Sequence, residues 1–265
     1  MPKRVYIALA FLLVVLAGVI GWQVLRLREP VYQGRRLSVW LEMATRQRMS
    51  GNPYDREVEA IRHIGTNALP VLIAMLRAHD MRLKQVIMTW AQKQKLVHFN
   101  FRSADQRRED AFTGYVALGS LASVQIPNLM DCLTNDPSPN VRMAAASALG
   151  QIGPDARVAA PALFRAAKDT NETVRIHAYW VLGQILPGAQ LAVPVLVAGL
   201  ADPYQAARDQ AALVLGKYGP EARAAVPALL RTLTTNRYAF LTTNRYAGSA
   251  LKKIDPEAAA KAGVE

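Results

Sequence analysis

The residue types that perform catalysis or bind metal ions are sparse in this chain and are not grouped. Its four histidines are His63, His79, His98 and His177, and no two of them have the spacing of three or four residues that brings ligands together on a helix face. Cys132 is the single cysteine, so neither an intrachain disulfide nor a cysteine-cluster metal site can form. We expect Cys132 to be a buried, small apolar residue.

The common motifs of nucleotide-dependent and hydrolytic enzymes are also missing from the sequence. It contains no phosphate-binding glycine loop ending in Lys-Ser or Lys-Thr and no Gly-x-Ser-x-Gly motif that would hold a nucleophilic serine. The glycines of Gly150-Gln-Ile-Gly153 recur with a repeat described below, so we interpret them as part of a helix end. We therefore expect a non-catalytic protein with no catalytic residues, no cofactor and no metal.

Basic side chains are the remaining candidates for binding chemistry. The chain of 265 residues carries 32 Lys and Arg against 20 Asp and Glu, a net charge of +12. One cluster could bind anionic lipid headgroups or an acidic partner, or it could be the solvated face of a helix whose apolar residues are buried. No nucleic-acid-reading motif accompanies it, so we expect no specific nucleic-acid partner. The cluster consists of Arg82, Lys84, Lys93, Lys95, Arg102, Arg107 and Arg108.

Residues 5–25 form an uninterrupted stretch without a charged side chain. A helix of this length spans about 31 Å, which matches the roughly 30 Å hydrocarbon core of a bilayer. Trp22 lies near one end, where an indole favours the headgroup region. We expect a retained, single-pass N-terminal anchor; the alternatives are a secretory signal cleaved after Ala17 and a buried soluble helix. Basic residues flank the stretch on both sides, so the side of the membrane that the body faces stays open.

The strongest pattern in the sequence is a repeat with a period of 33 residues. Leu-Gly pairs, prolines, aspartates and arginines each recur at this interval, and a repeat of this length is one structural unit that must stack on its neighbours to bury its apolar face. The series are Leu149-Gly150, Leu182-Gly183 and Leu215-Gly216; Pro161, Pro194 and Pro227; Asp136, Asp169 and Asp202; and Arg142, Arg175 and Arg208.

Each repeat is predicted to form two helices. Apolar residues at positions 141, 144, 145, 148, 149 and 152 follow the spacing of one helix face. Gly153-Pro154 should end this helix, because glycine tolerates a left-handed cap and proline cannot continue the hydrogen-bond pattern. A second helix is expected around Pro161 and to about Lys168.

Weaker copies of the repeat extend the array in both directions. Ile64-Gly65 belongs to a first unit, Leu118-Gly119 to a second, and residues 251–254 to a last half-unit. The segment Leu-Thr-Thr-Asn-Arg-Tyr-Ala occurs twice between residues 233 and 247, which we interpret as an insertion in a tolerant terminal unit; the alternative is a lengthened helix.

A longer insertion falls near residues 81–102. Its spacing predicts an amphipathic helix over 82–95 and a short extended piece over 97–101. Ser103 and Gln106 then form a capping-box pattern that should open a helix running to Leu118.

These residues resemble a known family. Asp-x5-Arg, followed by Ala-Ala-x-Ala-Leu-Gly-x-Ile-Gly-Pro and by Val/Ala-Pro-Ala-Leu, is similar to bacterial HEAT repeats, specifically the HEAT-like type first associated with phycobilisome lyases. The resemblance covers residues 55–260 and is strongest over 136–232. It implies that the recurring residues form a structural ladder of hydrogen bonds between adjacent units: Asp136, Asp169, Asp202, Arg142, Arg175 and Arg208. Residues 32–42 also resemble a segment that precedes HEAT repeats in membrane-attached bacterial proteins.

Together these features predict an all-α, right-handed α-solenoid of five to six helix pairs preceded by one transmembrane helix. The expected domains are an anchor with its flanks (1–29), a linker with a short amphipathic helix (30–54), the solenoid (55–260) and a tail (261–265). A stacked repeat offers a long concave surface to protein partners, so we expect a membrane-tethered interaction scaffold. The alternatives are an enzyme related to the bilin lyases, which only the resemblance suggests, and a basic module that binds anionic lipid headgroups.

Overall fold

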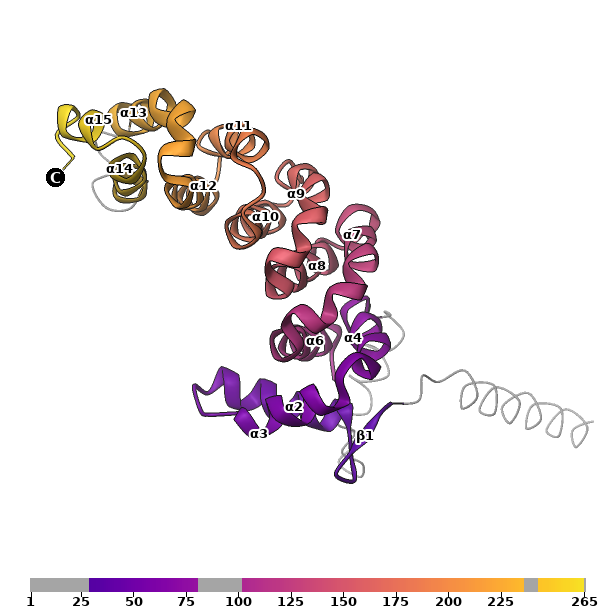
Figure 1. Cartoon of the computed structure of the whole chain (residues 1–265). Helices are drawn as coiled ribbons and strands as arrows, with labels where there is room; N and C mark the ends of the chain where they lie inside the picture. The colour runs from indigo at the N-terminus through magenta and orange to yellow at the C-terminus, as the bar shows by residue number, and fades with distance from the viewer. Residues whose placement is uncertain (1–28, 81–101, 236–242, 265) are drawn as a thin grey trace, which may run out of the picture.

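The computed structural model describes residues 29–80, 102–235 and 243–264. The predicted membrane span over 5–25, the predicted helix over 82–95, the extended piece over 97–101 and part of the duplicated segment therefore lie outside the described residues. The described residues are almost entirely helical, and the helix pairs are arranged in an arc (Figure 1).

Six helix pairs follow one another within the described part of the chain. In each pair the two helices are joined by a short 3-10 helix or a turn. The pairs are α3 (Asp55–Ile64) with α4 (Leu69–Leu76), α6 (Ala104–Leu118) with α7 (Ile126–Asn135), α8 (Pro139–Ile152) with α9 (Ala160–Ala166), α10 (Glu172–Ile185) with α11 (Ala189–Gly199), α12 (Gln205–Tyr218) with α13 (Val226–Thr235), and α14 (Thr243–Ile254) with α15 (Pro256–Lys261).

The break between the helices of a pair follows from local sequence. Gly153 ends α8 with a φ of 79°, a left-handed conformation that glycine adopts without steric cost, and Pro154 lies in the first turn of η3 (Gly153–Ala159). This confirms the helix end predicted from Gly153-Pro154. The other 3-10 connections are η1 (Gly65–Ala68), η2 (Gly119–Gln125) and η4 (Gly219–Ala225).

The pair of α10 and α11 departs from this pattern. The residue 33 positions after Gly153 is Leu186, which ends α10 with a φ of 41° and is followed by Pro187 rather than by a 3-10 helix. A non-glycine residue in this conformation is strained, because its Cβ approaches the following carbonyl oxygen. The connection to α11, residues 186–188, is shorter than the four 3-10 connections.

The helix pairs form two rows around a continuous core. The first helices, α6, α8, α10, α12 and α14, lie on the inner side of the arc, and the second helices lie on the outer side (Figure 1). Leu149, Leu163 and Leu182 are fully buried between the rows. Small residues allow close packing along the inner row: a Cβ added at Gly150 would come within 2.6 Å of the Trp180 ring, and one at Gly183 within 2.7 Å of Val214 Cγ2. The recurring Leu-Gly pairs thus set the spacing of adjacent units.

The N-terminal end of the arc is closed by a hairpin and a helix. Strands β1 (Val31–Tyr32) and β2 (Arg35–Arg36) pair antiparallel, and α2 (Leu37–Met49) follows directly. Leu37, Trp40 and Leu41 of α2 are buried in the core shared with the helix pairs, and Trp40 Nε1 donates to Tyr32 O over 3.1 Å. Residues 30–54, where we expected a linker with a short amphipathic helix, contain α2, and this helix packs on the solenoid.

Helix α6 begins as the sequence predicts. The Ser103 hydroxyl accepts from Gln106 N, and the Gln106 side chain accepts from Ser103 N, so the capping box is confirmed. By length and composition alone, Ala104–Asn135 is the described stretch apolar enough to cross a membrane. In the structure this stretch is divided into α6, η2 and α7; Tyr115, Leu118 and Leu129 pack in the core, whereas Leu121 and Val124 in η2 are exposed.

Candidate functional site

The recurring arginines and aspartates meet at one edge of the solenoid. Arg142, near the start of α8, binds the carboxylate of Asp169 in the next unit through two hydrogen bonds, from Nε to Oδ2 at 2.7 Å and from Nη2 to Oδ1 at 2.8 Å. Its remaining nitrogen, Nη1, donates to Asp136 O at 2.9 Å and Pro137 O at 3.2 Å. One guanidinium thus fixes its own inter-unit loop and the loop of the next unit.

The next unit repeats this arrangement with more burial. Arg175 donates from Nε to Asp202 Oδ2 at 2.7 Å and from Nη2 to Oδ1 at 2.9 Å, while Nη1 donates to Asp169 O at 2.9 Å. The exposed fractions of the two side chains are 10% and 4%. Bidentate pairing of this kind fixes both distance and orientation, so these contacts set the register of adjacent units.

The ladder carboxylates stay ionised because of their hydrogen bonds. Burial alone would raise the pKa of Asp169 and Asp202, but the hydrogen bonds from Arg142 and Arg175, the backbone donors and the nearby arginine charges together outweigh it. Backbone donors add to this effect: Asn171 N and Tyr204 N each donate to the carboxylate at 2.9 Å. The pKa values of both aspartates therefore lie below the ordinary value.

The two ends of the ladder differ from its middle. At the first end, the Asp136 carboxylate accepts from Ser138 N at 2.9 Å and lies 3.8 Å from His79 Nε2. At the last end, Arg208 Nη1 donates to Asp202 O and Pro203 O as the earlier arginines do, but Nη2 donates to Gln205 Oε1 at 2.7 Å instead of to an aspartate. The six predicted ladder residues thus form two complete Arg–Asp pairs and two ends.

A second set of basic residues joins adjacent units at the opposite edge, and sequence reasoning missed it. Arg157 Nε in η3 donates to Ile185 O at the end of α10 over 2.8 Å, and Arg62 Nε donates to Ala117 O over 2.9 Å. Both carbonyls belong to the last turn of an inner-row helix, where intrahelical donors run out. The positions 33 residues on either side of Arg157 are Val124 and Gln190, and Arg223, 66 residues on, pairs with the Asp255 carboxylate, so no regular series points to this role.

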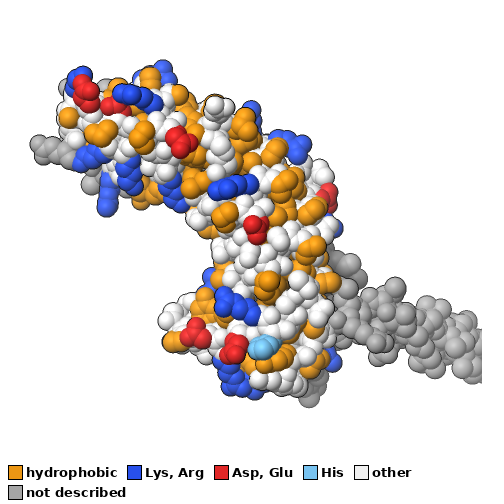
Figure 2. Space-filling view, viewed as in Figure 1, with side chains coloured by type: hydrophobic (Ala, Val, Ile, Leu, Met, Phe, Trp, Pro, Cys, Tyr) orange, Lys and Arg blue, Asp and Glu red, His pale blue; other side chains and the backbone are white. Residues whose placement is uncertain are grey.

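Three members of the predicted basic cluster are described, and all three contact acidic residues. Arg102 pairs with Glu42 and Asp110 at 2.9 Å each, and Arg107 lies 3.6 Å from Asp80. Arg108 pairs with Asp105 and donates to the Ala78 carbonyl. The other four, Arg82, Lys84, Lys93 and Lys95, lie outside the described residues. On the face shown in Figure 2, basic side chains are spread along the whole arc among hydrophobic and acidic ones.

Arg102 also belongs to a buried polar contact between α2 and α6. Asp110 on α6 is 1% exposed, and burial raises its pKa to about 6, although Arg102 opposes the shift. Beside it, Thr45 Oγ1 on α2 donates to Thr113 Oγ1 at 2.9 Å. The first helix of the body is thus attached to α6 by polar as well as apolar contacts.

The inner side of the arc carries a hollow of about 320 Å³ that spans four consecutive inner-row helices. It is lined by the two aromatic side chains of Phe112 and Trp180 and one aliphatic side chain with polar groups between them, a composition typical of protein–protein interfaces. Its lining residues are Phe112 from α6, Ser147 from α8, Ile176, His177 and Trp180 from α10, and Gln210 from α12.

The side chains of this hollow are held in place by their neighbours. The Trp180 ring packs over Gly150, and the Arg48 guanidinium lies 5.0 Å from the centre of the Phe112 ring. His177 Nδ1 lies 2.8 Å from Thr173 O, which directs the other ring nitrogen away from the backbone of its own helix. The hollow is therefore a preformed surface with fixed aromatic anchors.

Comparisons with known proteins agree with the repeat seen in the geometry. A family model described as HEAT repeats matches residues 126–216, which span α7 to α12. The chain carries HEAT-like repeats. No curated protein matches the sequence.

Two solved repeat-protein and engineered structures are similar to this HEAT-like chain. A crystal structure of an engineered protein is 17% identical, covers 82% of this chain and 96% of its own, and has a TM-score of 0.43. A designed armadillo repeat protein in complex with the peptide (KR)4 is 19% identical, covers 81% of this chain and 99% of its own, and has a TM-score of 0.44.

Cys132 and the metal-ligand types complete the survey of side-chain chemistry. Cys132 is 2% exposed, which confirms its predicted burial, and its Sγ accepts from Arg77 Nε at 3.0 Å. Burial raises the pKa of its thiol, although Arg77 opposes the shift. Among the described residues, no three His, Cys, Asp or Glu side chains are grouped so that they could hold a metal ion.

Proposed function

We propose that this protein is a membrane-tethered scaffold whose inner face binds a protein partner. The observation that carries the proposal is the hollow across α6, α8, α10 and α12, because it is built from the one row of helices that faces the inside of the arc. Its anchors, Trp180 and Phe112, are the residue types that dominate protein–protein recognition when they sit in preformed pockets.

Site-specific photo-crosslinking tests the inner face. A photoreactive phenylalanine placed at Gln210, inside the hollow, should give a defined covalent adduct in the native cell. The same residue placed at Val158, which is 65% exposed on η3 outside the hollow, is the matched control and should not give that adduct. Ile176→Lys in the same chain should abolish the adduct at 210, because it places a charge among the apolar contacts. Adducts at 158 and not at 210 would contradict the proposal.

The proposed tether is the apolar stretch over residues 5–25. The body begins immediately after this segment: the Glu29 carboxylate accepts from Ser38 Oγ at 2.6 Å, which fixes the chain at the start of α2. We expect the full chain to stay in the membrane fraction after alkaline carbonate washing and a chain of residues 29–265 to be released. Release of the full chain, or a mature N-terminus beginning at residue 18, would contradict a retained anchor.

A further inference from the structure

Arg208, the last arginine of the ladder, has a pair of donor atoms, Nε and Nη2, that could bind both oxygens of a carboxylate. We call this pair the fork; it receives no carboxylate from the described part of the chain. Arg208 is held as Arg142 and Arg175 are held, because its Nη1 donates to the carbonyls of the residues six and five positions before it, Asp202 and Pro203. In the two complete Arg–Asp pairs, which are the rungs of the ladder, these hydrogen bonds of Nη1 leave Nε and Nη2 directed at both oxygens of one carboxylate. The residue 33 positions after Asp202, where the next aspartate would stand, is Thr235.

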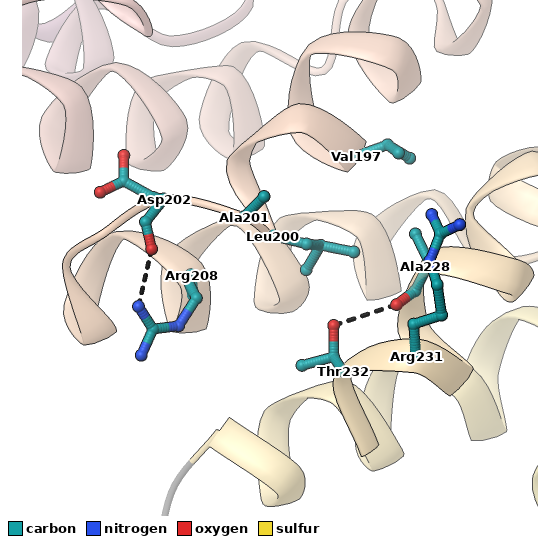
Figure 3. Close-up of a pocket in the computed structure, with 8 residues that line it drawn as sticks. All are labelled: Val197, Leu200, Ala201, Asp202, Arg208, Ala228, Arg231 and Thr232. Atoms are coloured by element: carbon teal, nitrogen blue, oxygen red, sulfur yellow. Dashed lines mark hydrogen bonds between the residues drawn. The ribbon is translucent and has the colours of Figure 1, made fainter. Parts of the chain in front are cut away.

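A pocket of about 440 Å³ lies at this position (Figure 3). It is lined from α11 and its following turn by Val197, Leu200 and Ala201, and from α13 by Ala228, Arg231 and Thr232; Arg208 lines it from α12. In the complete rungs, the carboxylate likewise comes from just beyond the outer-row helix of the next unit.

The charges around the pocket favour an anion. Arg208 and Arg231 line it from different helices and on opposite sides, so two of its lining side chains are positively charged (Figure 3). Asp202 is the acidic residue among the lining residues, and its charge is already paired with Arg175. In Figure 3 the Asp202 carboxylate points away from Arg208, and only its backbone carbonyl accepts from that residue.

In the structure, the side chain of Gln205 accepts a hydrogen bond from one nitrogen of the fork. Its Oε1 accepts from Arg208 Nη2 at 2.7 Å, the nitrogen that binds an aspartate in the complete rungs, while its Nε2 donates to Asp209 at 2.8 Å. A neutral amide oxygen is a weaker acceptor for a guanidinium than a carboxylate is. An incoming carboxylate can therefore take the place of the amide oxygen on Nη2.

We infer that the pocket at Arg208 binds a carboxylate of another protein chain, which completes the ladder as an added rung. The carboxylate belongs to an acidic side chain or to a C-terminus, because both present the same two oxygens to the fork. This site lies at the ladder edge, between α11, α12 and α13, and none of its lining residues belongs to the hollow on the inner face. It therefore does not depend on the proposed function.

The test is an NMR titration that observes the arginine Nε–H signals of the protein. Four probes are compared: N-acetyl-aspartate N-methylamide, which carries a side-chain carboxylate; N-acetyl-alanine, which carries a terminal one; N-acetyl-asparagine N-methylamide, which carries neither; and inorganic phosphate. The Arg208 signal, assigned from its loss in Arg208→Lys, should shift saturably with at least one carboxylate probe, with a dissociation constant on the order of millimolar for so small a ligand. The asparagine probe should leave it in place.

Variants separate this site from general charge attraction. Arg208→Lys keeps the charge but loses the planar fork, and should weaken carboxylate binding at least about tenfold, as followed on the line width of the probe's own methyl signals. Arg165→Gln removes one exposed charge on α9 and should not change binding. The inference is overturned if neither carboxylate probe shifts the Arg208 signal, if only phosphate shifts it, or if Arg208→Lys binds the carboxylate as tightly as the parent protein does. Thermal unfolding of each variant is the control that it is folded.

Discussion

Single glycines in the inner row decide how closely neighbouring units can approach. Gly150 faces the Trp180 ring so closely that even a methyl group has no room. We expect Gly150→Ala to lower the free energy of unfolding by about 1–3 kcal/mol, the usual effect of overpacking a core, as measured by urea denaturation.

A double-mutant cycle provides the control for this prediction. In a Trp180→Ala background the ring that the new methyl group would meet is gone, so Gly150→Ala should cost much less than it does alone. Equal costs in both backgrounds would show that the Gly150–Trp180 contact does not set the helix spacing.

Leu186 shows the opposite situation, a position where glycine is missing. Because Leu186 has a φ of 41° and is 39% exposed, Leu186→Gly relieves strain and loses little burial, and it should stabilise the protein by up to about 1 kcal/mol in thermal unfolding. Leu191→Gly is the matched control, since Leu191 is exposed but helical, and it should destabilise by about 1 kcal/mol. A loss of stability in Leu186→Gly would contradict the strain.

The buried rung between Arg175 and Asp202 should be the most sensitive pair of the ladder. Asp202→Asn leaves the Arg175 charge buried without its partner, so we expect the free energy of unfolding to fall by about 3 kcal/mol at neutral pH. Glu257→Gln removes one member of an exposed pair with Lys261 and should leave stability unchanged. Equal effects in urea denaturation would mean that the ladder does not join the units.

Between elements, the contact of α2 with α6 should respond to pH in the direction opposite to the ladder. The folded protein holds the Asp110 proton up to a pKa of about 6, whereas the unfolded chain loses it near 3.8. The contribution of Asp110 to stability therefore falls as pH rises from about 4 to 6, while the ladder aspartates, whose pKa values are lowered, lose their contribution as pH falls below about 4.

Asp110→Asn isolates this effect because it removes the titrating group and keeps a similar shape. Relative to the parent, its free energy of unfolding should increase between pH 4 and 6 and stay level above that range, as measured by urea denaturation at each pH. Asp105→Asn, an exposed change on the same helix, should give a curve parallel to the parent. A parallel curve for Asp110→Asn would contradict the raised pKa.

The elements that the sequence predicted best are those that repeat. The period of 33 and the Gly153-Pro154 break located α8 and α9, and Ser103 with Gln106 located the start of α6. The role of α2 was missed because its partners are distant in sequence: Thr45 meets Thr113 across 68 residues, and no local pattern encodes that contact. Arg157 was missed for a related reason, since each unit caps its neighbour with a different residue or none.

In the whole molecule, the inner and outer rows of helices differ in the kind of surface that they expose. The outer row and the two edges carry packing, ladder pairs and helix caps, whereas the inner row carries the hollow with its aromatic anchors. The inner face could not be located from the sequence, because Phe112, Ile176, Trp180 and Gln210 come from three helices and follow no shared series. Only the stacking of the units brings them together.

The most direct test of the scaffold is hydrogen exchange on the protein purified with its cross-linked partner and on the protein alone. The account predicts that partner binding slows amide exchange in α6, α8, α10 and α12 and leaves α7, α9, α11 and α13 unchanged. Slower exchange confined to the outer-row helices, or no difference along the inner row, would contradict it.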